Sequence, residues 1–261
     1  MNRALWVAKT GLETQSLRMA IVSNNLANVS TNGYKKSRGL FQDLLYQNVR
    51  QPGAKTSENT TLPSGLMLGS GVRTTATQKI FTQGNFIQTE NTYDMGIQGR
   101  GFFQILMPDG TINYTRDGAF QVDANGLLVT SSGYQLQPSV QIPFNAQSFT
   151  VGADGVVTVQ EAGSPDAIQV GQIQLADFIN PAGLESLGDN LYAETTASGP
   201  PQIGNPGVDS LGTLIQGSVE SSNVNVVEEL VNMIETQRAY EMNSKAISAV
   251  DGMLRNLNQN L

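Results

Sequence analysis

Apolar residues recur every seven residues at both ends of this chain, and this spacing constrains the fold more than any other feature. The N-terminal repeat consists of Leu5, Leu12, Met19 and Leu26, and the C-terminal repeat consists of Val226, Met233, Tyr240, Ile247 and Leu254, flanked by Leu230. A repeat of this kind is typical of helices that pack on other helices. It predicts one helix near each end of the chain.

Local signals indicate where these helices begin and end. Thr31-Asn32-Gly33 is a stop signal, because glycine readily takes the left-handed conformation that ends a helix. Asn225 is a good N-cap, and Glu228 stands three residues further on, as in a capping box. The first helix is therefore expected to end at 31–33, and the second to run from Val226 to the end of the chain.

The middle of the chain is expected to be rich in β-structure. Turn signals occur at Asp109-Gly110, Asp117-Gly118, Asn125-Gly126, Ser132-Gly133 and Asp154-Gly155. Strands are expected at 102–107, 111–115, 120–122, 127–130, 147–151, 156–159, 168–178 and 190–194. The short spacing of the first four turn signals predicts a β-meander or a small barrel.

Together these patterns predict an α+β protein, in which a β-rich domain is inserted into a discontinuous, coiled-coil-like helical domain. Residues 1–35 and 217–261 are assigned to the helical core domain, 36–71 to a connecting region, and 72–216 to the β-rich outer domain. The stretch 46–71 is rich in Ser, Thr, Gly and Asn. It is therefore either an extended loop or an excursion that packs only on a partner.

Composition narrows the classes of function. The chain has no cysteine and no histidine, which excludes disulfides, thiol nucleophiles, imidazole metal ligands and Ser-His-Asp catalysis. Carboxylate enzymes need neither residue, so an enzyme is disfavoured but not excluded. Only 14% of residues are charged, against about 25% in typical domains, so Asn, Gln, Ser and Thr must supply most of the polar surface.

The net charge of −7 is unevenly distributed. Residues 1–50 carry seven basic groups against Glu13 and Asp43, whereas residues 101–220 carry twelve acidic groups and one basic group, Arg116. An acidic body disfavours nucleic acid and anionic lipid as partners. The basic N-terminal groups, which include Lys35, form either an interaction arm or a solvated helix face.

Targeting signals are weak. No apolar run approaches the length of a membrane span, so no direct membrane insertion is expected. No cleavable signal peptide is recognisable. The chain is therefore expected to be cytoplasmic, or exported by a route that leaves its N-terminus intact.

Several carboxylates are candidates for catalysis or for metal binding. Asp109, Asp117 and Asp154 each precede a glycine and could act as acid and base in glycan hydrolysis, but Asp-Gly is first a turn signal. Asp123 begins a fragment that resembles a calcium loop, yet position 134 is Tyr where such a loop needs Glu. We expect no catalytic residue, no cofactor and no metal site, and a glycan-active enzyme of the cell envelope stays open as an alternative.

The two predicted helices carry more apolar surface than one pairing can cover. A helix with a thin apolar stripe gains its stability from packing, so the economical arrangement pairs the two ends of the chain. Polar residues interrupt the stripes at Gln15, Gln237, Ser244 and Asp251, which suits a crowded lattice of helices. Identical subunits that pack head to tail without closing build a helical tube. Periodicity alone, however, favours an ordinary helical hairpin in a monomer.

Two motifs favour the helical tube over the monomeric hairpin. The residues Asn24, Asn25, Leu26, Ala27 and Asn28, followed by Thr31, Asn32, Gly33, Tyr34 and Lys35, closely resemble the N-terminal signature of the flagellar axial proteins of rod and hook. The stretch 219–243, with Glu220-Ser221-Ser222-Asn223-Val224, looks like the C-terminal signature of the same family. The segments 99–103 and 114–118 are similar to those of hook and proximal rod proteins, so the resemblance covers essentially the whole chain.

The resemblance implies a structural subunit that polymerises with its own copies into a helical tube. It implies export through the flagellar type III apparatus without cleavage, and a tube that crosses the periplasm to the outer membrane and carries torque to the hook. The implied partners are further copies of the chain, the export apparatus, the proximal rod protein FlgF and hook protein FlgE at the ends of the tube, and the P-ring FlgI and L-ring FlgH around it.

One segment is similar to the distal rod members of this family in particular. It includes Tyr46, Arg50, Gln51, Pro52, Gly53, Leu62, Pro63 and Gly65. The resemblance implies that the segment 46–65 keeps the rod straight by adding contacts between neighbouring subunits. A hook or proximal rod protein is the alternative within the family.

Overall fold

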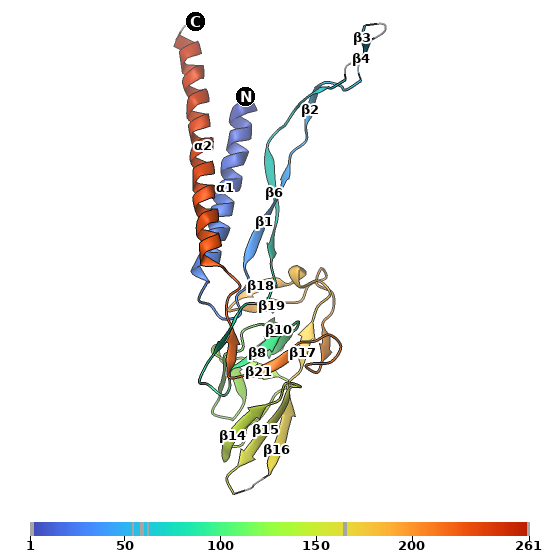
Figure 1. Ribbon diagram of the computed structural model, residues 1–261, viewed down its shortest axis with the longest axis vertical. Coiled ribbons are helices and arrows are strands. Elements are labelled where there is room, and N and C mark those ends of the chain that lie inside the picture. The colour runs from blue at the N-terminus through green and yellow to red at the C-terminus, as the bar shows by residue number, and fades with distance from the viewer. Residues whose placement is uncertain (1–2, 54, 58–59, 62, 164–165, 260–261) are drawn as a thin grey trace. The chain divides into compact units, whose positions relative to one another are not determined.

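A computed structural model describes residues 3–53, 55–57, 60–61, 63–163 and 166–259 (Figure 1). The chain divides into two compact units. The helical unit combines Met1–Ala27, Ser37–Gln78 and Asn225–Leu261, and the β unit combines Asn28–Lys36 and Lys79–Val224. Each unit is therefore assembled from segments that are far apart in the sequence.

Two long helices dominate the helical unit. α1 (Arg3–Ala27) and α2 (Val226–Gln259) lie side by side and run antiparallel (Figure 1). The Asn225 side chain caps α2, because its Oδ1 accepts hydrogen bonds from the backbone N–H groups of Val227 at 3.0 Å and Glu228 at 3.4 Å. The predicted start of this helix and the predicted α+β class are thus confirmed. Within the described residues, neither helix is both long and apolar enough to span a membrane.

The first helix is shorter than predicted. α1 ends at Ala27, so its predicted extension to 31–33 is wrong. The chain turns after this point, because the Thr31 N–H donates to the Asn28 carbonyl at 3.3 Å and the Thr31 hydroxyl donates to the Asn28 side chain at 3.2 Å. Gly33 does take the left-handed conformation, with φ of 66°, but it lies six residues after the end of α1 and does not terminate this helix.

Paired strands complete the helical unit. β1 (Ser37–Asp43) pairs with β6 (Val72–Lys79), β2 (Gln47–Arg50) with β5 (Leu66–Leu68), and β3 (Lys55–Ser57) with β4 (Thr60–Thr61). We call residues 44–71 the arm. The sequence predicts either an extended loop or an excursion for the stretch 46–71. The structure shows an antiparallel hairpin there (Figure 1). The residues of β2 and β5 are exposed on both faces, so no alternation of apolar and polar residues marks them as strands.

The β unit is built around one nine-stranded sheet with the order β11-β12-β13-β9-β10-β19-β18, to which β17 is added on β9 and β20 on β17. These strands are β9 (Phe102–Leu106), β10 (Ile112–Thr115), β11 (Phe120–Val122), β12 (Leu128–Thr130), β13 (Gln135–Gln137), β17 (Leu175–Asp177), β18 (Glu185–Gly188), β19 (Leu191–Ala193) and β20 (Gln202–Gly204). Because β9 pairs with both β10 and β13, the sheet is not a simple meander.

Smaller sheets complete this unit. β14 (Ala146–Val151), β15 (Val156–Glu161) and β16 (Ala167–Gln172) form a three-stranded sheet, β8 (Met95–Gln98) pairs with β21 (Thr213–Gln216), and β7 (Phe86–Gln88) pairs with β22 (Ser218–Glu220). A short 3₁₀ helix, η1, covers Pro181–Gly183. The predicted strand 168–178 is divided into β16, which ends at Gln172, and β17, which begins at Leu175 and pairs with β9 and β20 instead of β15.

Four of the predicted glycine turns are present. In each, the glycine N–H bonds back to the residue three positions earlier, and φ is positive, at Gly110, Gly126, Gly133 and Gly155. The turn predicted at Asp117-Gly118 takes a different form, in which the Asp117 side chain accepts the Ala119 N–H at 3.1 Å and the Gly118 carbonyl accepts the Met95 N–H at 2.9 Å. A side chain at Gly118 would clash with the Met95 carbonyl, so close packing of two segments explains this glycine.

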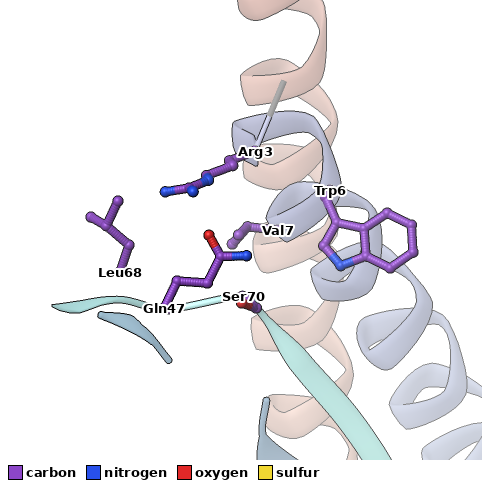
Figure 2. A pocket seen from close by; sticks show the side chains of 7 residues that line it. Arg3, Trp6, Val7, Gln47, Leu68 and Ser70 are labelled. Carbon is purple, nitrogen blue, oxygen red and sulfur yellow. The ribbon is translucent and has the colours of Figure 1, made fainter. Parts of the chain in front are cut away.

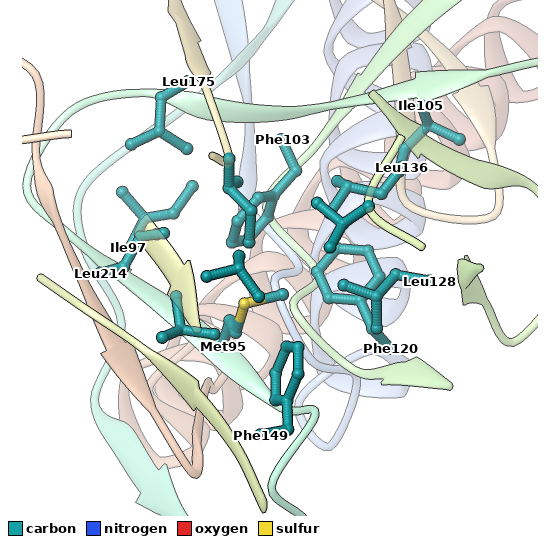
Figure 3. Close-up of a cluster of buried hydrophobic side chains, with 14 of the residues drawn as sticks. Met95, Ile97, Phe103, Ile105, Phe120, Leu128, Leu136, Phe149, Leu175 and Leu214 are labelled. Atoms are coloured by element: carbon teal, nitrogen blue, oxygen red, sulfur yellow. The ribbon is translucent and has the colours of Figure 1, made fainter. Parts of the chain in front are cut away.

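The core of the β unit lies on both sides of β9. Phe103 and Ile105 point into a large apolar cluster that also contains Met95, Ile97, Phe120, Leu128, Leu136, Phe149, Leu175 and Leu214 (Figure 3). Phe102 belongs to a second cluster with Tyr114, Ala176, Phe178, Leu184 and Tyr192. Successive side chains of a strand point to opposite faces, so β9 is covered by apolar side chains on both sides.

Candidate functional site

Asn25 of the N-terminal signature joins three elements of the helical unit. Its buried side chain pairs with the backbone of Ser37, accepting from the N–H and donating to the carbonyl, each at 2.9 Å. Its Nδ2 also lies 3.4 Å from Oε2 of Glu229, a buried carboxylate of α2. The amide therefore acts as a strand partner for β1 and holds the end of α1 against the beginning of α2.

The second half of the signature reaches a buried ionic cluster in the β unit. The cluster consists of Lys35, Arg116 and Glu220, none of which is more than 5% exposed. Lys35 Nζ lies 2.5 Å from Glu220 Oε1, and Arg116 Nη1 lies 3.3 Å from Glu220 Oε2. Lys35 and Glu220 are 185 residues apart in the chain. The ionic cluster therefore joins the N-terminal signature, the 114–118 motif and the C-terminal signature.

The backbone completes this cluster. The Gly84 N–H donates to Glu220 at 2.8 Å, Lys35 donates to the Thr82 carbonyl at 2.8 Å, and Arg116 donates to the Gly99 carbonyl at 2.7 Å. The Arg116 guanidinium lies over the Phe102 ring at 5.3 Å, and its buried Nε has no hydrogen-bond partner. Two cations thus share one carboxylate, and all three side chains are almost completely buried.

Burial dominates the electrostatics of the cluster. Loss of hydration lowers the pKa of both Lys35 and Arg116 below their ordinary values, while the Glu220 carboxylate opposes this change by raising both pKa values. Burying a charge is unfavourable unless an opposite charge compensates. Glu220 is therefore required by both cations.

The position of Lys35 corrects an interpretation of the sequence. Lys35 was grouped with the basic residues of an interaction arm or a solvated helix face, but its side chain is completely buried. Nothing local distinguishes it from the neighbouring Lys36. The missing information was the position of Glu220, which only the fold supplies.

Two further signature residues fit the same region. A side chain at Gly33 would come within 2.6 Å of the backbone nitrogen of Asp117, so both the positive φ and this close approach require glycine. In the C-terminal signature, the Asn223 side chain accepts the N–H of Lys36 at 2.7 Å and donates to the Ile80 carbonyl at 2.8 Å. The signature residues therefore act as internal links within their own unit.

The remaining signature residues are more accessible. Asn24 and Ala27 are exposed, while Leu26, Asn28, Thr31 and Asn32 are half-buried. The Asn32 carbonyl accepts a hydrogen bond from the Asn190 side chain at 3.0 Å, within the β unit.

Polar and small residues fill much of the contact between α1 and α2. The fully buried helix residues include Thr10, Thr14, Val22, Asn25, Glu229 and Thr236, and a side chain at Gly11 would touch Asn243 at 3.1 Å. Gln15 also has a buried Oε1 without a hydrogen-bond partner. Among these residues only Val22 is a large apolar one, and the apolar residues of the stripes are at most half-buried.

The predicted packing residues are divided between this contact and the outer surface. Leu5, Leu12, Met19, Leu26, Met233 and Ile247 are half-buried, whereas Val226, Leu230, Tyr240 and Leu254 are exposed. Val227, Val231, Ile234, Met242 and Met253 are also exposed on α2. The helix pair thus presents large apolar side chains to its surroundings.

The arm is as open as the helices. Tyr46, Arg50, Gln51, Pro52, Gly53 and Pro63 are exposed and Gly65 is half-buried, while Leu62 lies outside the described residues. Gly65 allows the two strands to approach, because a side chain there would lie 2.6 Å from the Arg50 carbonyl. At the base of the arm, the Thr10 hydroxyl accepts the Val72 N–H at 3.4 Å, and a side chain at Gly71 would clash with that hydroxyl. The arm is therefore fixed to α1 at its base.

A pocket of about 300 Å³ lies between the arm and the first turns of α1. Arg3 and Val7 of α1 point toward Gln47 and Leu68 of the arm, and Trp6, Gly69 and Ser70 complete the lining (Figure 2). The lining is mainly apolar, with Arg3 as its charged group. This pocket is suited to an apolar side chain flanked by negative charge.

The carboxylates considered for catalysis have a structural role. Asp109, Asp117 and Asp154 each accept a hydrogen bond from the N–H two residues further along the chain, at 3.0, 3.1 and 3.2 Å. This bond is the mark of an Asx turn. Burial raises the pKa of Asp117 above its ordinary 3.8, whereas Asp109 is exposed and its bonds to Thr111 lower its pKa. Among the described residues, no three acidic side chains gather into a metal site.

Comparison with known families shows the class of protein that this arrangement defines. The model of the flagella basal body rod protein family matches residues 5–35, that of the flagellar hook protein FlgE/F/G D1 domain matches 96–159, and that of the flagellar basal body rod FlgEFG protein C-terminal region matches 215–260. The class is that of the flagellar axial proteins, which are structural proteins and not enzymes.

Whole-chain relatives specify the family further. The chain is 56% identical over 259 residues to the flagellar basal-body rod protein FlgG of Buchnera aphidicola subsp. Schizaphis graminum, covering 99% of this chain and 100% of the relative. It is 45% identical over 260 residues to FlgG of Agrobacterium fabrum, covering 99% of each, and 34% identical over 252 residues to the rod protein FlgF of Caulobacter vibrioides, covering 94% of this chain and 92% of the relative. The chain belongs to the family of the flagellar basal-body rod protein FlgG.

Proposed function

We propose that this chain is the subunit of the distal rod of the flagellum. Copies of it polymerise into a rigid helical tube that reaches from the periplasm to the outer membrane and transmits torque to the hook. Its relatives are basal-body rod proteins, which supports this place in the organelle. The proposed partners are further copies of the chain, the proximal rod and hook proteins at the ends of the tube, the P and L rings around it and the export apparatus.

The observation that carries this proposal is the inverted character of the helix pair. The buried residues of the two helices are mostly threonine, asparagine and glutamate, whereas their exposed residues include valine, leucine, isoleucine and methionine. An exposed apolar patch of this kind marks an interaction site. Because such residues run along α2, and Trp6 and Val7 are exposed on the first turns of α1, we propose that other copies of the helix pair cover them.

The same observation supports export in an unfolded form. Helices gain most of their stability from packing an apolar face, and this pair leaves much of its apolar surface uncovered. We propose that the terminal helices unfold for passage through the type III export channel, with the N-terminus left uncleaved, and become stable on assembly. In the assembled rod, residues 1–35 and 217–261 form the core domain, 36–71 the connecting region and 72–216 the outer domain.

We propose a mechanical role for the arm. A two-stranded hairpin is marginally stable in water, and the described residues of β2 and β5 are exposed, so a neighbouring subunit is the natural source of packing. Contacts through segment 46–65 would prevent neighbouring subunits from sliding past each other and would keep the tube straight. Deletion of 46–65 should give a tube that curves, and straight tubes from this deletion would contradict the role.

A matched pair of substitutions tests assembly. Val227 of α2 and Ile179 of the β unit are 69% and 74% exposed. Val227→Asp should raise the protein concentration needed for assembly about tenfold or more, as the loss of an interface anchor does, whereas Ile179→Asp should leave it unchanged. Sedimentation and electron microscopy of the purified chain measure this concentration.

Two results would contradict the proposed assembly. A purified chain that stays monomeric at every concentration, with ordered helices and no tubes, would remove the proposal. Equal effects of the two substitutions would show that the helix pair has no special part in assembly.

A further inference from the structure

The helical unit has two uncovered apolar surfaces of complementary form. The first is the α1 pocket, lined by Arg3, Trp6, Val7, Gln47, Leu68, Gly69 and Ser70 (Figure 2). The second is the α2 patch, which consists of Val227, Leu230, Val231 and Ile234 on the first turns of α2, exposed by 43–69%. One surface is concave and the other is a convex face of a helix.

We propose that the α1 pocket of one copy binds the α2 patch of a second copy. This inference rests on the proposed function, because it names the two surfaces through which neighbouring subunits of the tube meet. The occupant of the pocket is a helix of the same chain, with Leu230 at the centre of the contact.

Charge complementarity favours this occupant. The pocket carries Arg3, and Lys9, which pairs with Glu13 at 3.5 Å, follows on the next turns of α1. Three exposed carboxylates, Glu228, Glu235 and Glu241, accompany the patch along the first half of α2 and outnumber its one exposed cation there, Arg238. Basic groups on one surface and acidic groups on the other align the two partners and disfavour pairing of two identical surfaces.

The register of the helices places the two surfaces at opposite ends of the helix pair. Asn25 contacts Glu229 and Gly11 faces Asn243, so Leu230 lies beside the end of α1 while the pocket lies beside its beginning. At 1.5 Å per residue, Val7 and Leu230 of one chain are about 25 Å apart along the helix axis. One molecule therefore cannot fill its own pocket.

This separation determines the type of assembly. A copy that inserts its patch into a neighbour keeps its own pocket open for the next copy. Contacts between different surfaces do not close on themselves in a dimer and build an extended polymer. The α1 pocket and the α2 patch thus provide a repeating contact for a tube.

Other exposed apolar residues fit the pocket less well. Leu45 and Phe144 are 91% and 88% exposed, but each is a single protruding side chain, and neither is accompanied by three carboxylates. The α2 patch offers four side chains on consecutive turns of one rigid helix. A preorganised surface loses less entropy on binding than a single mobile side chain.

Cysteine cross-linking tests this contact directly, because the natural chain contains no cysteine. Two full-length variants, Val7→Cys and Leu230→Cys, are purified separately and mixed at a concentration where the unmodified protein assembles. A mild oxidant is added, and disulfide-linked dimers are counted on a denaturing gel. Disulfides require Cα atoms within about 7 Å, so a cross-link reports close contact between two chains.

The expected result is a cross-linked dimer in the mixture and little in either variant alone. Mixtures of Val7→Cys with Leu45→Cys or Phe144→Cys serve as comparisons, and efficient cross-linking there instead would overturn the proposal. Tubes that form without a Val7–Leu230 cross-link would overturn this contact and leave the proposed function intact. A cross-link without tubes would support the contact and count against the tube, and a mixture with neither would overturn both.

Discussion

Replacement of Glu220 by glutamine probes the ionic cluster with almost no change in side-chain size. The substitution keeps an oxygen that can accept the Gly84 N–H and the Lys35 ammonium, which Glu220 binds at 2.8 and 2.5 Å. It removes the negative charge, so Lys35 and Arg116 remain buried without a counter-charge. It also puts an amide NH2 in place of the oxygen that accepts from Arg116 at 3.3 Å, so the experiment measures the loss of the carboxylate as counter-charge and acceptor.

The size of the effect follows from burial. Removing one partner of a buried ion pair costs about 3–5 kcal/mol, because the remaining charge is left uncompensated. For a unit of this size, 1 kcal/mol corresponds to roughly 2–4 °C in melting temperature, so Glu220→Gln should lower the melting temperature of the β unit by about 6–20 °C.

The assay is thermal unfolding followed by the far-ultraviolet circular dichroism of the β-structure. Tryptophan fluorescence is unsuitable, because the single tryptophan, Trp6, lies in α1 of the helical unit. The control is Glu185→Gln, which removes the same charge from an exposed position of β18. It should change the melting temperature by about 1 °C or less, as surface substitutions usually do.

A double variant separates charge from general damage. Lys35→Met combined with Glu220→Gln removes one of the two stranded cations, so it should be more stable than Glu220→Gln alone. If the single variant melts with the Glu185→Gln control, or if the double variant is the less stable of the two, the electrostatic reasoning is refuted.

Three further predictions use the same measurements. Gly33→Ala should destabilise the β unit by about 1 kcal/mol or more beyond Gly133→Ala, since both glycines have positive φ but only Gly33 is closely packed; melting temperatures compare them. Asn25→Asp should loosen the start of α2, because a carboxylate cannot donate to the β1 carbonyl and faces a carboxylate of α2; hydrogen exchange should rise there but not in Ser23→Asp. Burial raises the pKa of Asp117 in the folded protein above its ordinary 3.8, so stability should fall as the pH rises from the ordinary pKa through the raised one, and Asp117→Asn should remove that fall from the pH dependence of the melting temperature.

The parts of the fold that could be predicted from the sequence are those with local causes. The start of α2 follows from the Asn225 cap, and the glycine turns that join β9 to β10 and β11 to β12 are marked clearly in the sequence. The strands β2 and β5 of the arm could not be predicted, since their side chains are exposed on both faces and show no alternation. Helix periodicity indicated that an apolar stripe exists on each helix, but it could not identify which neighbour covers that stripe.

The ionic cluster was beyond sequence reasoning for a different reason. A lysine, an arginine and a glutamate are ordinarily surface residues, and the pairs Lys35–Glu220 and Arg116–Glu220 span 185 and 104 residues of chain. A useful signal was nevertheless present. All three charges belong to motifs of the family signatures, and a charged residue inside such a motif is a candidate for a buried partner.

The two units use polar groups for the same purpose. Asn25 links α1, β1 and α2 in the helical unit, and the ionic cluster links the N-terminal and C-terminal signatures in the β unit. Hydrogen bonds and ion pairs depend on direction and distance, so they select one register where apolar contacts would accept several. If apolar residues filled these internal contacts, less apolar surface would remain on the helices for other copies. In the proposed tube, polar links inside the subunit and apolar surfaces outside it are therefore two parts of one arrangement, in which the internal links supply specificity and contacts with neighbouring subunits supply much of the stability.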